Sequence, residues 1–174
     1  MKRIFTAAIA LVLALALLMG IAYAEDASFD DIFTNRNIVH ETAEFPKLKY
    51  YGFATVTDDG MVDCVEFWSK RDKVHEMIYT MGHPVQGMNS AQKQWVEIVY
   101  KGSLSQIEKE DFCTIDYQMG DDYYMITVHY TDMTDKYTIE RMGYYGMMED
   151  KGANYISAKM MAESFRAQGY LEKK

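Results

Sequence analysis

The chain is sparing in proline and cysteine, with two of each among 174 residues. The cysteines, Cys64 and Cys113, are too far apart in sequence for the Cys-x-x-Cys spacing of a redox centre. No long apolar run follows the one at the N-terminus, so we expect no transmembrane segment after N-terminal processing. Internal repeats and low-complexity tracts are also missing, and the length suits one domain with a hydrophobic core.

Signatures of common enzyme classes are absent as well. The sequence has no Gly-x-Ser-x-Gly nucleophile motif, no His-Glu-x-x-His zinc motif and no glycine-rich phosphate loop. Its 26 acidic and 18 basic residues give a net charge of −8, and no basic patch carries interleaved aromatic residues. Phosphate backbones repel such a chain. We therefore expect a protein that is not an enzyme, needs no cofactor and does not bind nucleic acid.

The N-terminus has the pattern of a secretory signal peptide. Lys2-Arg3 precede an apolar run over residues 4–19, and Ala22-Tyr23-Ala24 supplies small residues at positions −3 and −1 of a cleavage site. The run is shorter than the ~20 residues of a membrane span. We predict that residues 1–24 are a signal peptide and that the protein is secreted or periplasmic; an uncleaved N-terminal anchor is the alternative.

An exported protein can form disulfides, and both cysteines lie in strand-like segments. A bridge between Cys64 and Cys113 would close a loop of about 50 residues and stabilise the fold by about 4 kcal/mol on the chain-entropy model. We predict this disulfide. Two buried free thiols are the alternative.

Most of the chain reads as antiparallel strands. Residues 48–57, 61–68 and 73–81 are rich in aromatic and β-branched types, and the hairpin sequence Asp58-Asp59-Gly60 separates the first two. These segments predict a three-stranded meander. Residues 111–119 and 123–133 alternate around Gly120-Asp121-Asp122 and predict a further hairpin. Its expected core residues are Cys113, Ile115, Tyr117, Met119, Tyr124, Ile126, Val128 and Tyr130.

Two helices are expected. The first runs from an N-cap at Ser90 to Gly102, and the second begins at Ser157 or Asn154 and ends before Gly169. Residues 136–148 are ambiguous and suggest a short strand and loop. The inner faces predicted from helical spacing are Ala91, Trp95, Ile98 and Val99 in the first helix and Ala158, Met161, Ala162 and Phe165 in the second.

The order strands, helix, hairpin, helix predicts a single α+β domain over residues 47–174. In it an antiparallel β-sheet, a meander plus a hairpin, packs against two helices that cover one face. Residues 25–46 form a weakly structured N-terminal arm that Pro46 ends and that can dock on the domain. Ser28, followed by Asp30 and Asp31, can start a short helix in this arm.

Three stretches, residues 59–84, 113–134 and 155–174, resemble the YehR-like small lipoproteins, a bacterial family of unknown function. The resemblance implies the same α+β fold and brings neither an activity nor site residues. That family carries a lipid on a cysteine that follows its export signal. This chain has Ala-Tyr-Ala before Glu25 instead. The difference favours a free secreted or periplasmic protein.

The chain is methionine-rich, with 14 methionines. His75, Met77, Met81 and His83 share one parity of a predicted strand and would lie on one face together with Tyr79. Thioether and imidazole ligands suit copper, above all Cu(I). The competing interpretation is that methionine fills the core and the histidines lie at edges or on the surface. Met125, His129 and Met133 repeat the pattern, and a joint surface would form if the two strands were neighbours.

Aromatic and acidic residues give weaker indications. Tyrosine occurs in adjacent pairs, one member of which can be exposed for binding a sugar or a protein, or simply belong to an aromatic-rich sheet. We expect Trp68 and Trp95 in the core. Parity places Cys113 and His129 on opposite faces, which argues against a catalytic pair. The tyrosine pairs are Tyr50-Tyr51, Tyr123-Tyr124 and Tyr144-Tyr145. Among the acidic residues, Glu66, Glu76 and Glu97 either share a cleft or are solvated.

These observations favour a non-enzymatic secreted or periplasmic binding protein that engages a protein or cell-envelope partner through its sheet or a sheet edge. The alternative is a small-ligand or copper-type metal-binding protein that uses His75, Met77, Met81 and His83. A hydrolytic enzyme comes third, because no assembled catalytic group is visible in the sequence.

Overall fold

A computed structural model describes residues 28–145 and 154–174. The predicted signal peptide, residues 1–24, lies outside the described residues. In the described part of the chain, no helix is long and apolar enough to cross a membrane. The helices are α2 (Phe29–Thr34), α3 (Ser90–Leu104), the 3₁₀ helix η1 (Ile107–Lys109), α4 (Lys136–Tyr144) and α5 (Ala158–Ala167); the strands are β1 (Lys49–Val56), β2 (Val62–Lys70), β3 (Lys73–Pro84), β4 (Cys113–Met119), β5 (Tyr123–Tyr130) and β6 (Leu171–Glu172).

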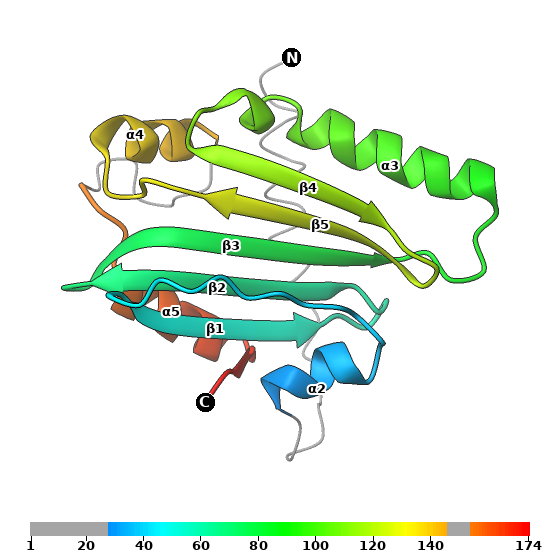
Figure 1. Ribbon diagram of the computed structural model, residues 1–174, viewed down its shortest axis with the longest axis horizontal. Coiled ribbons are helices and arrows are strands. Elements are labelled where there is room, and N and C mark those ends of the chain that lie inside the picture. The colour runs from blue at the N-terminus through cyan, green and yellow to red at the C-terminus, as the bar shows by residue number, and fades with distance from the viewer. Residues whose placement is uncertain (1–27, 146–153) are drawn as a thin grey trace.

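The strands form one six-stranded antiparallel sheet in the order β4-β5-β3-β2-β1-β6 (Figure 1). The predicted α+β class, the meander β1-β2-β3 and the hairpin β4-β5 are confirmed. The hairpin joins the meander through pairing of β5 with β3. The two-residue strand β6, which the sequence did not predict, pairs with β1.

Local geometry explains the turns of the meander. Gly60 has φ +83°, which suits the residue that ends the first turn. The second turn places Arg71 and Asp72 at φ +53° and +65°, as a two-residue hairpin turn of type I′ requires. The Asp72 carboxylate accepts hydrogen bonds from Ser157 Oγ at 2.9 Å and Lys159 N at 2.8 Å, so this turn also fixes the start of α5.

One face of the sheet packs against α3, α4 and α5 and forms the larger core. Strand alternation places Val65 and Phe67 of β2 on this helix-side face, opposite Tyr79 and Met77 of β3. The expected core residues of β5 are confirmed, since all are at most 4% exposed. They are Tyr124, Ile126, Val128 and Tyr130.

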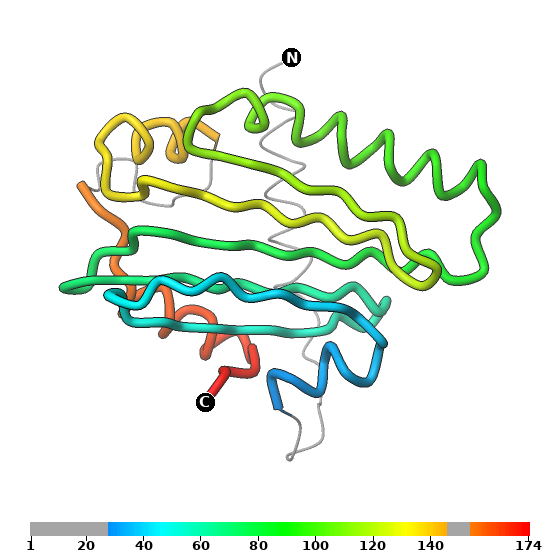
Figure 2. The backbone as a smooth tube through the Cα atoms, viewed as in Figure 1, coloured from blue at the N-terminus to red at the C-terminus, as the bar shows by residue number. Residues whose placement is uncertain are grey.

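The opposite face is covered too, so the expectation that helices cover only one face is wrong. Ser28 caps α2 in a reciprocal arrangement with Asp31, and Phe29, Ile32 and Phe33 pack on apolar residues of β1 and β2. Residues 35–48, which we call the strap, then run along β1 and β2 on the side opposite α5 (Figure 2). The arm is therefore a second covering layer.

Helix α3 faces the sheet with a different stripe from the one predicted. It begins after Asn89, whose side chain accepts a hydrogen bond from Gln92 N at 3.0 Å. Val96 is 4% exposed, whereas Trp95 is 66% exposed, and Ile98 and Val99 are also exposed. The prediction of the inner face and of a core Trp95 is wrong, because the helix carries a second apolar stripe. That stripe, Val96, Tyr100 and Leu104, packs on the core.

Helix α4 differs from the prediction for its residues, whereas helix α5 agrees with it. Residues 136–144 are helix α4, not a strand, and Asp135 caps it by accepting a hydrogen bond from Thr138 N at 3.1 Å. Helix α5 is capped by Ser157 as predicted, its inner residues Ala158 and Ala162 are buried, and Gly169 at φ +82° follows its end.

The predicted disulfide is wrong, because Cys64 and Cys113 are free, buried thiols. Cys64 belongs to the cluster beneath α2, and Cys113 belongs to the helix-side core. Their strands, β2 and β4, are separated by β3 and β5. Three strand spacings amount to about 14 Å, while Cα atoms of bridged cysteines lie within about 7 Å.

Candidate functional site

The predicted Met/His row of β3 lies largely inside the protein. Met77 and Met81 are 7% and 6% exposed in the helix-side core. His83 Nδ1 lies 3.1 Å from the hydroxyl of Tyr100 on α3. His75 lies near the other end of the strand, where it lines an open pocket of about 350 Å³. The structure thus separates His75 from His83, and copper binding by these residues stays a prediction.

The second Met/His row does not join the first. Strands β3 and β5 are neighbours, but Met77 and Met81 pair with Tyr130 and Ile126 rather than with methionine or histidine. Met125 and His129 therefore face the strap side of the sheet. His129 Nε2 lies there 3.1 Å from Glu76 Oε2.

A polar cluster that the sequence did not predict lies between β2 and the strap, and we call it the strap cluster: His40, Thr42, Tyr50, Cys64 and Glu66. Strand alternation points Cys64 and Glu66 toward the strap. Glu66 is completely buried. Its Oε1 accepts hydrogen bonds from Tyr50 OH and, at 2.9 Å, from Thr42 Oγ1. Its Oε2 lies 3.0 Å from His40 Nε2.

Aromatic packing fixes the strap above this cluster. The ring of Phe33, on α2, stacks on the His40 ring with centroids 4.2 Å apart. Phe45 packs edge-on against buried Trp68 at 4.8 Å. The histidine was missed at the sequence level because it lies in a segment without a strong periodic pattern.

The strap cluster holds one negative charge away from water. Burial alone would raise the pKa of the Glu66 carboxyl, but contacts from His40, Tyr50 and Thr42 outweigh burial and lower this pKa. Burial and the same carboxylate raise the pKa of Tyr50 and of the Cys64 thiol. Both therefore stay protonated beside an ionised glutamate. Cys64, His40 and Glu66 also bring their potential metal-ligand atoms within 4.8 Å of one another.

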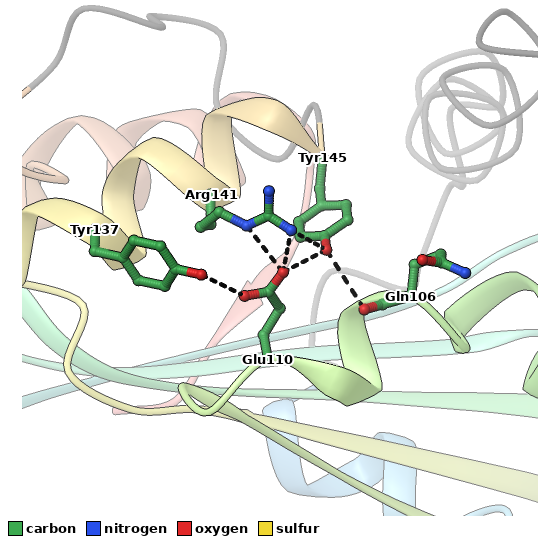
Figure 3. Close-up of polar contacts among 5 residues, drawn as sticks. All are labelled: Gln106, Glu110, Tyr137, Arg141 and Tyr145. Carbon is green, nitrogen blue, oxygen red and sulfur yellow. Dashed lines mark hydrogen bonds and ion pairs between the residues drawn. The ribbon is translucent and has the colours of Figure 1, made fainter.

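A second polar cluster joins α4 to the segment after η1 (Figure 3). The Arg141 guanidinium binds Glu110 Oε1 through Nε at 2.9 Å and through a second nitrogen, and Tyr145 OH donates to the same oxygen. Tyr137 OH approaches the other carboxylate oxygen at 3.4 Å. The Arg141 contact lowers the pKa of the Glu110 carboxyl. The polar groups of this cluster satisfy one another's hydrogen bonds, which is typical of a structural clamp.

The three carboxylates considered in the sequence do not share a cleft. Glu66 and Glu76 lie on the strap side of the sheet, in separate contacts with His40 and His129. Glu97 lies on α3 and pairs with Lys101 at 2.7 Å. Among the paired tyrosines, Tyr144 is the markedly exposed one, at 69%.

The most exposed apolar surface of α3 is the outer stripe: Ala91, Trp95, Ile98, Val99 and Gly102. Its three large side chains are 66%, 61% and 43% exposed. The charged side chains beside the stripe are held by other groups, since Lys101 pairs with Glu97 and Lys93 Nζ donates to the carbonyl oxygens of Gly120 and Asp121. The stripe is thus an uncharged apolar strip about three helical turns long.

Comparison with known proteins gives likeness of fold. No protein-family model matches the chain, and no curated protein matches its sequence. The NMR structure of YehR from E. coli is similar with a TM-score of 0.51 and 15% identity, covering 73% of this chain and 91% of YehR. The NMR structure of a protein from Streptococcus pneumoniae TIGR4 is similar with a TM-score of 0.49 and 13% identity, covering 89% of this chain and 97% of that protein. The likeness to YehR shows that the chain has a YehR-like fold.

Proposed function

We propose that this chain is a non-enzymatic binding protein, exported by the signal peptide of residues 1–24, that binds a helix of a partner protein along the outer stripe of α3. The observation that carries the proposal is the exposure of Trp95 and Ile98 on a helix whose opposite face is packed. Exposed tryptophan is costly in water and is enriched at protein interfaces.

The spacing of the outer stripe favours a helix as the occupant. Ala91, Trp95, Ile98 and Gly102 follow one another at intervals of four, three and four residues, which is the spacing of a coiled-coil seam. The small residues lie at the two ends, where they allow a neighbouring backbone to approach closely. A partner helix with its own apolar seam fits this surface.

Charge favours a partner with basic flanks. The chain carries a net charge of −8, which opposes contact with a second copy or with an anionic bilayer. Exposed acidic residues also lie near both ends of α3: Asp121 near Lys93, and Glu108 and Asp111 after the helix. A helix with an apolar seam between lysines or arginines complements this arrangement.

The buried carboxylates support binding rather than catalysis. Glu66 is covered by the strap, and buried Asp63 accepts a hydrogen bond from Tyr170 inside the core. Neither group opens onto a cleft in the described structure that would admit a substrate. A family relationship to the YehR-like proteins is consistent with the fold, and we include it in the proposal.

Site-specific photocrosslinking in the producing cells tests this function. A photoreactive phenylalanine at position 95 should crosslink to one partner protein, while the same residue at position 160, exposed on α5, should not. The helix found in the crosslink, made as a peptide, should then bind the purified protein. Ile98→Glu should weaken that binding at least tenfold, and Met160→Glu should not change it.

Crosslinks between two copies of this chain would show that the occupant is a second copy and would overturn the proposal. Position-95 crosslinks that form only to lipid would overturn it in favour of a membrane surface. Absence of any crosslink specific to position 95 would also overturn it.

A further inference from the structure

We propose that Cys64, His40 and Glu66 form a binding site for a tetrahedral divalent metal ion of the zinc class, enclosed between β2 and the strap. This inference goes beyond the binding function of α3 and concerns the opposite side of the sheet. It uses none of the residues of the Met/His row of β3.

The donor set matches the proposed ion. Cys64 offers a sulfur, His40 an imidazole nitrogen and Glu66 a carboxylate oxygen, which are the three ligand types that zinc takes in proteins. Cu(I) is a poorer match because a carboxylate oxygen is a hard ligand. Three protein ligands are also the number that open zinc sites supply.

The distances agree with tetrahedral coordination. Ordinary zinc bond lengths and tetrahedral angles place nitrogen and sulfur ligands about 3.6 Å apart and nitrogen and oxygen ligands about 3.4 Å apart. Cys64 Sγ lies 3.9 Å from His40 Nε2, and Glu66 Oε2 lies 3.0 Å from it. These two distances differ from the tetrahedral values by less than 0.5 Å, and the three ligand atoms all lie within 4.8 Å of one another.

A buried oxygen points to an occupant. Glu66 Oε2 is buried and has no aligned hydrogen bond in the structure, although His40 Nε2 is close. Buried carboxylate oxygens are normally satisfied. An ion between Oε2, Nε2 and Sγ would satisfy all three ligand atoms.

The surrounding residues already orient the ligands. Tyr50 and Thr42 hold the other oxygen of Glu66, and the Phe33 ring holds the plane of His40. Such supporting contacts are typical of metal sites. Binding requires Cys64 as a thiolate, so each bound ion releases the thiol proton to solvent, while the Glu66 carboxylate oxygen and the His40 imidazole nitrogen bind through their lone pairs.

Cobalt(II) is the probe, because a tetrahedral cobalt–thiolate site absorbs strongly in the visible and near ultraviolet. The purified protein, treated with chelator and kept reduced, should bind one equivalent of Co²⁺ with both absorptions, and Zn²⁺ should displace it. Cys64→Ser should lose the thiolate absorption. Cys113→Ser, which changes the other buried thiol, should retain it.

His40→Gln provides a second test that leaves the sheet unchanged, with His129→Gln as the matched histidine control. His40→Gln should weaken Co²⁺ binding at least tenfold, and circular dichroism should show that both variants are folded. Absence of the absorption from the unmodified protein would overturn the proposal. Its persistence in Cys64→Ser or unchanged affinity in His40→Gln would do the same. None of these results depends on α3, so failure here is distinguishable from failure of the proposed function.

Discussion

Tyr170 donates a hydrogen bond of 2.8 Å to Asp63 across 107 residues of sequence, inside the helix-side core. This contact ties the segment after α5 to the centre of the sheet. Burial raises the pKa of the Asp63 carboxyl, and its other oxygen, Oδ1, has no hydrogen-bond partner in the structure. The Tyr79 hydroxyl approaches the same carboxyl, and the Tyr170 hydroxyl makes the well-formed hydrogen bond to it.

Replacing Tyr170 with phenylalanine should destabilise the protein by about 1–3 kcal/mol, because the substitution leaves a buried carboxyl oxygen without its donor. Urea unfolding at neutral pH measures the change. Tyr144→Phe is the control, since Tyr144 is 69% exposed and its loss of a hydroxyl should change stability by less than about 0.5 kcal/mol. Equal effects of the two variants would contradict the role assigned to Tyr170.

The two faces of α3 should respond differently to truncation. Val96→Ala removes buried methyl groups and should cost about 1–3 kcal/mol. Ile98→Ala, two residues away on the outer stripe, should change stability by at most about 0.5 kcal/mol. Thermal unfolding of both variants tests the orientation of the helix. A larger loss from Ile98→Ala would mean that the predicted inner face was right.

The clamp between Glu110 and Arg141 should make stability depend on acid pH. Arg141 lowers the pKa of Glu110 in the folded state. The ionised Glu110 therefore contributes its full stabilisation of the fold above the unfolded-state pKa of about 4.3, and this stabilisation is lost as the pH falls through the folded-state pKa. Glu110→Gln should cost about 1 kcal/mol at pH 7 and flatten the loss of stability between pH 5 and 3 in urea-unfolding series. Glu140→Gln, which alters an exposed pair with Lys136, should follow the unmodified protein. A Glu110→Gln profile parallel to that of the unmodified protein would contradict the prediction.

Tryptophan emission should separate the two indole rings. Trp68 is 2% exposed and Trp95 is 66% exposed. Trp95→Phe should therefore shift the native emission to the blue and make it resistant to acrylamide, whereas Trp68→Phe should leave red-shifted emission that acrylamide quenches. Similar quenching of the two variants would show that the outer stripe is covered in solution.

The strands could be predicted because alternation is a local property of the sequence. It identified the core residues of β5 correctly. The inner face of α3 could not be predicted in the same way, because this helix has two apolar stripes and only the position of the sheet decides between them. Trp95 belongs to the stripe with the larger side chains, yet it is the exposed one.

The disulfide and the strap cluster depend on long-range register. Nothing local to Cys64 or Cys113 shows that the two face opposite sides of one sheet. His40 likewise becomes part of a polar cluster only when the strap docks and places the imidazole ring beside Glu66. The number and spacing of such residues in the sequence contain no signal for either arrangement.

Each of the two layers contains one buried thiol, so thiol labelling can measure the local opening of each layer separately. A thiol reagent reaches Cys64 only when α2 and the strap lift from the sheet, and it reaches Cys113 only when the helix-side core opens. Two labelling rates, read separately in Cys113→Ser and Cys64→Ser, would therefore give the opening free energy of each layer in the native state. A ligand that stabilises the closed state of one layer would slow the labelling of the thiol in that layer and leave the labelling rate of the other thiol unchanged.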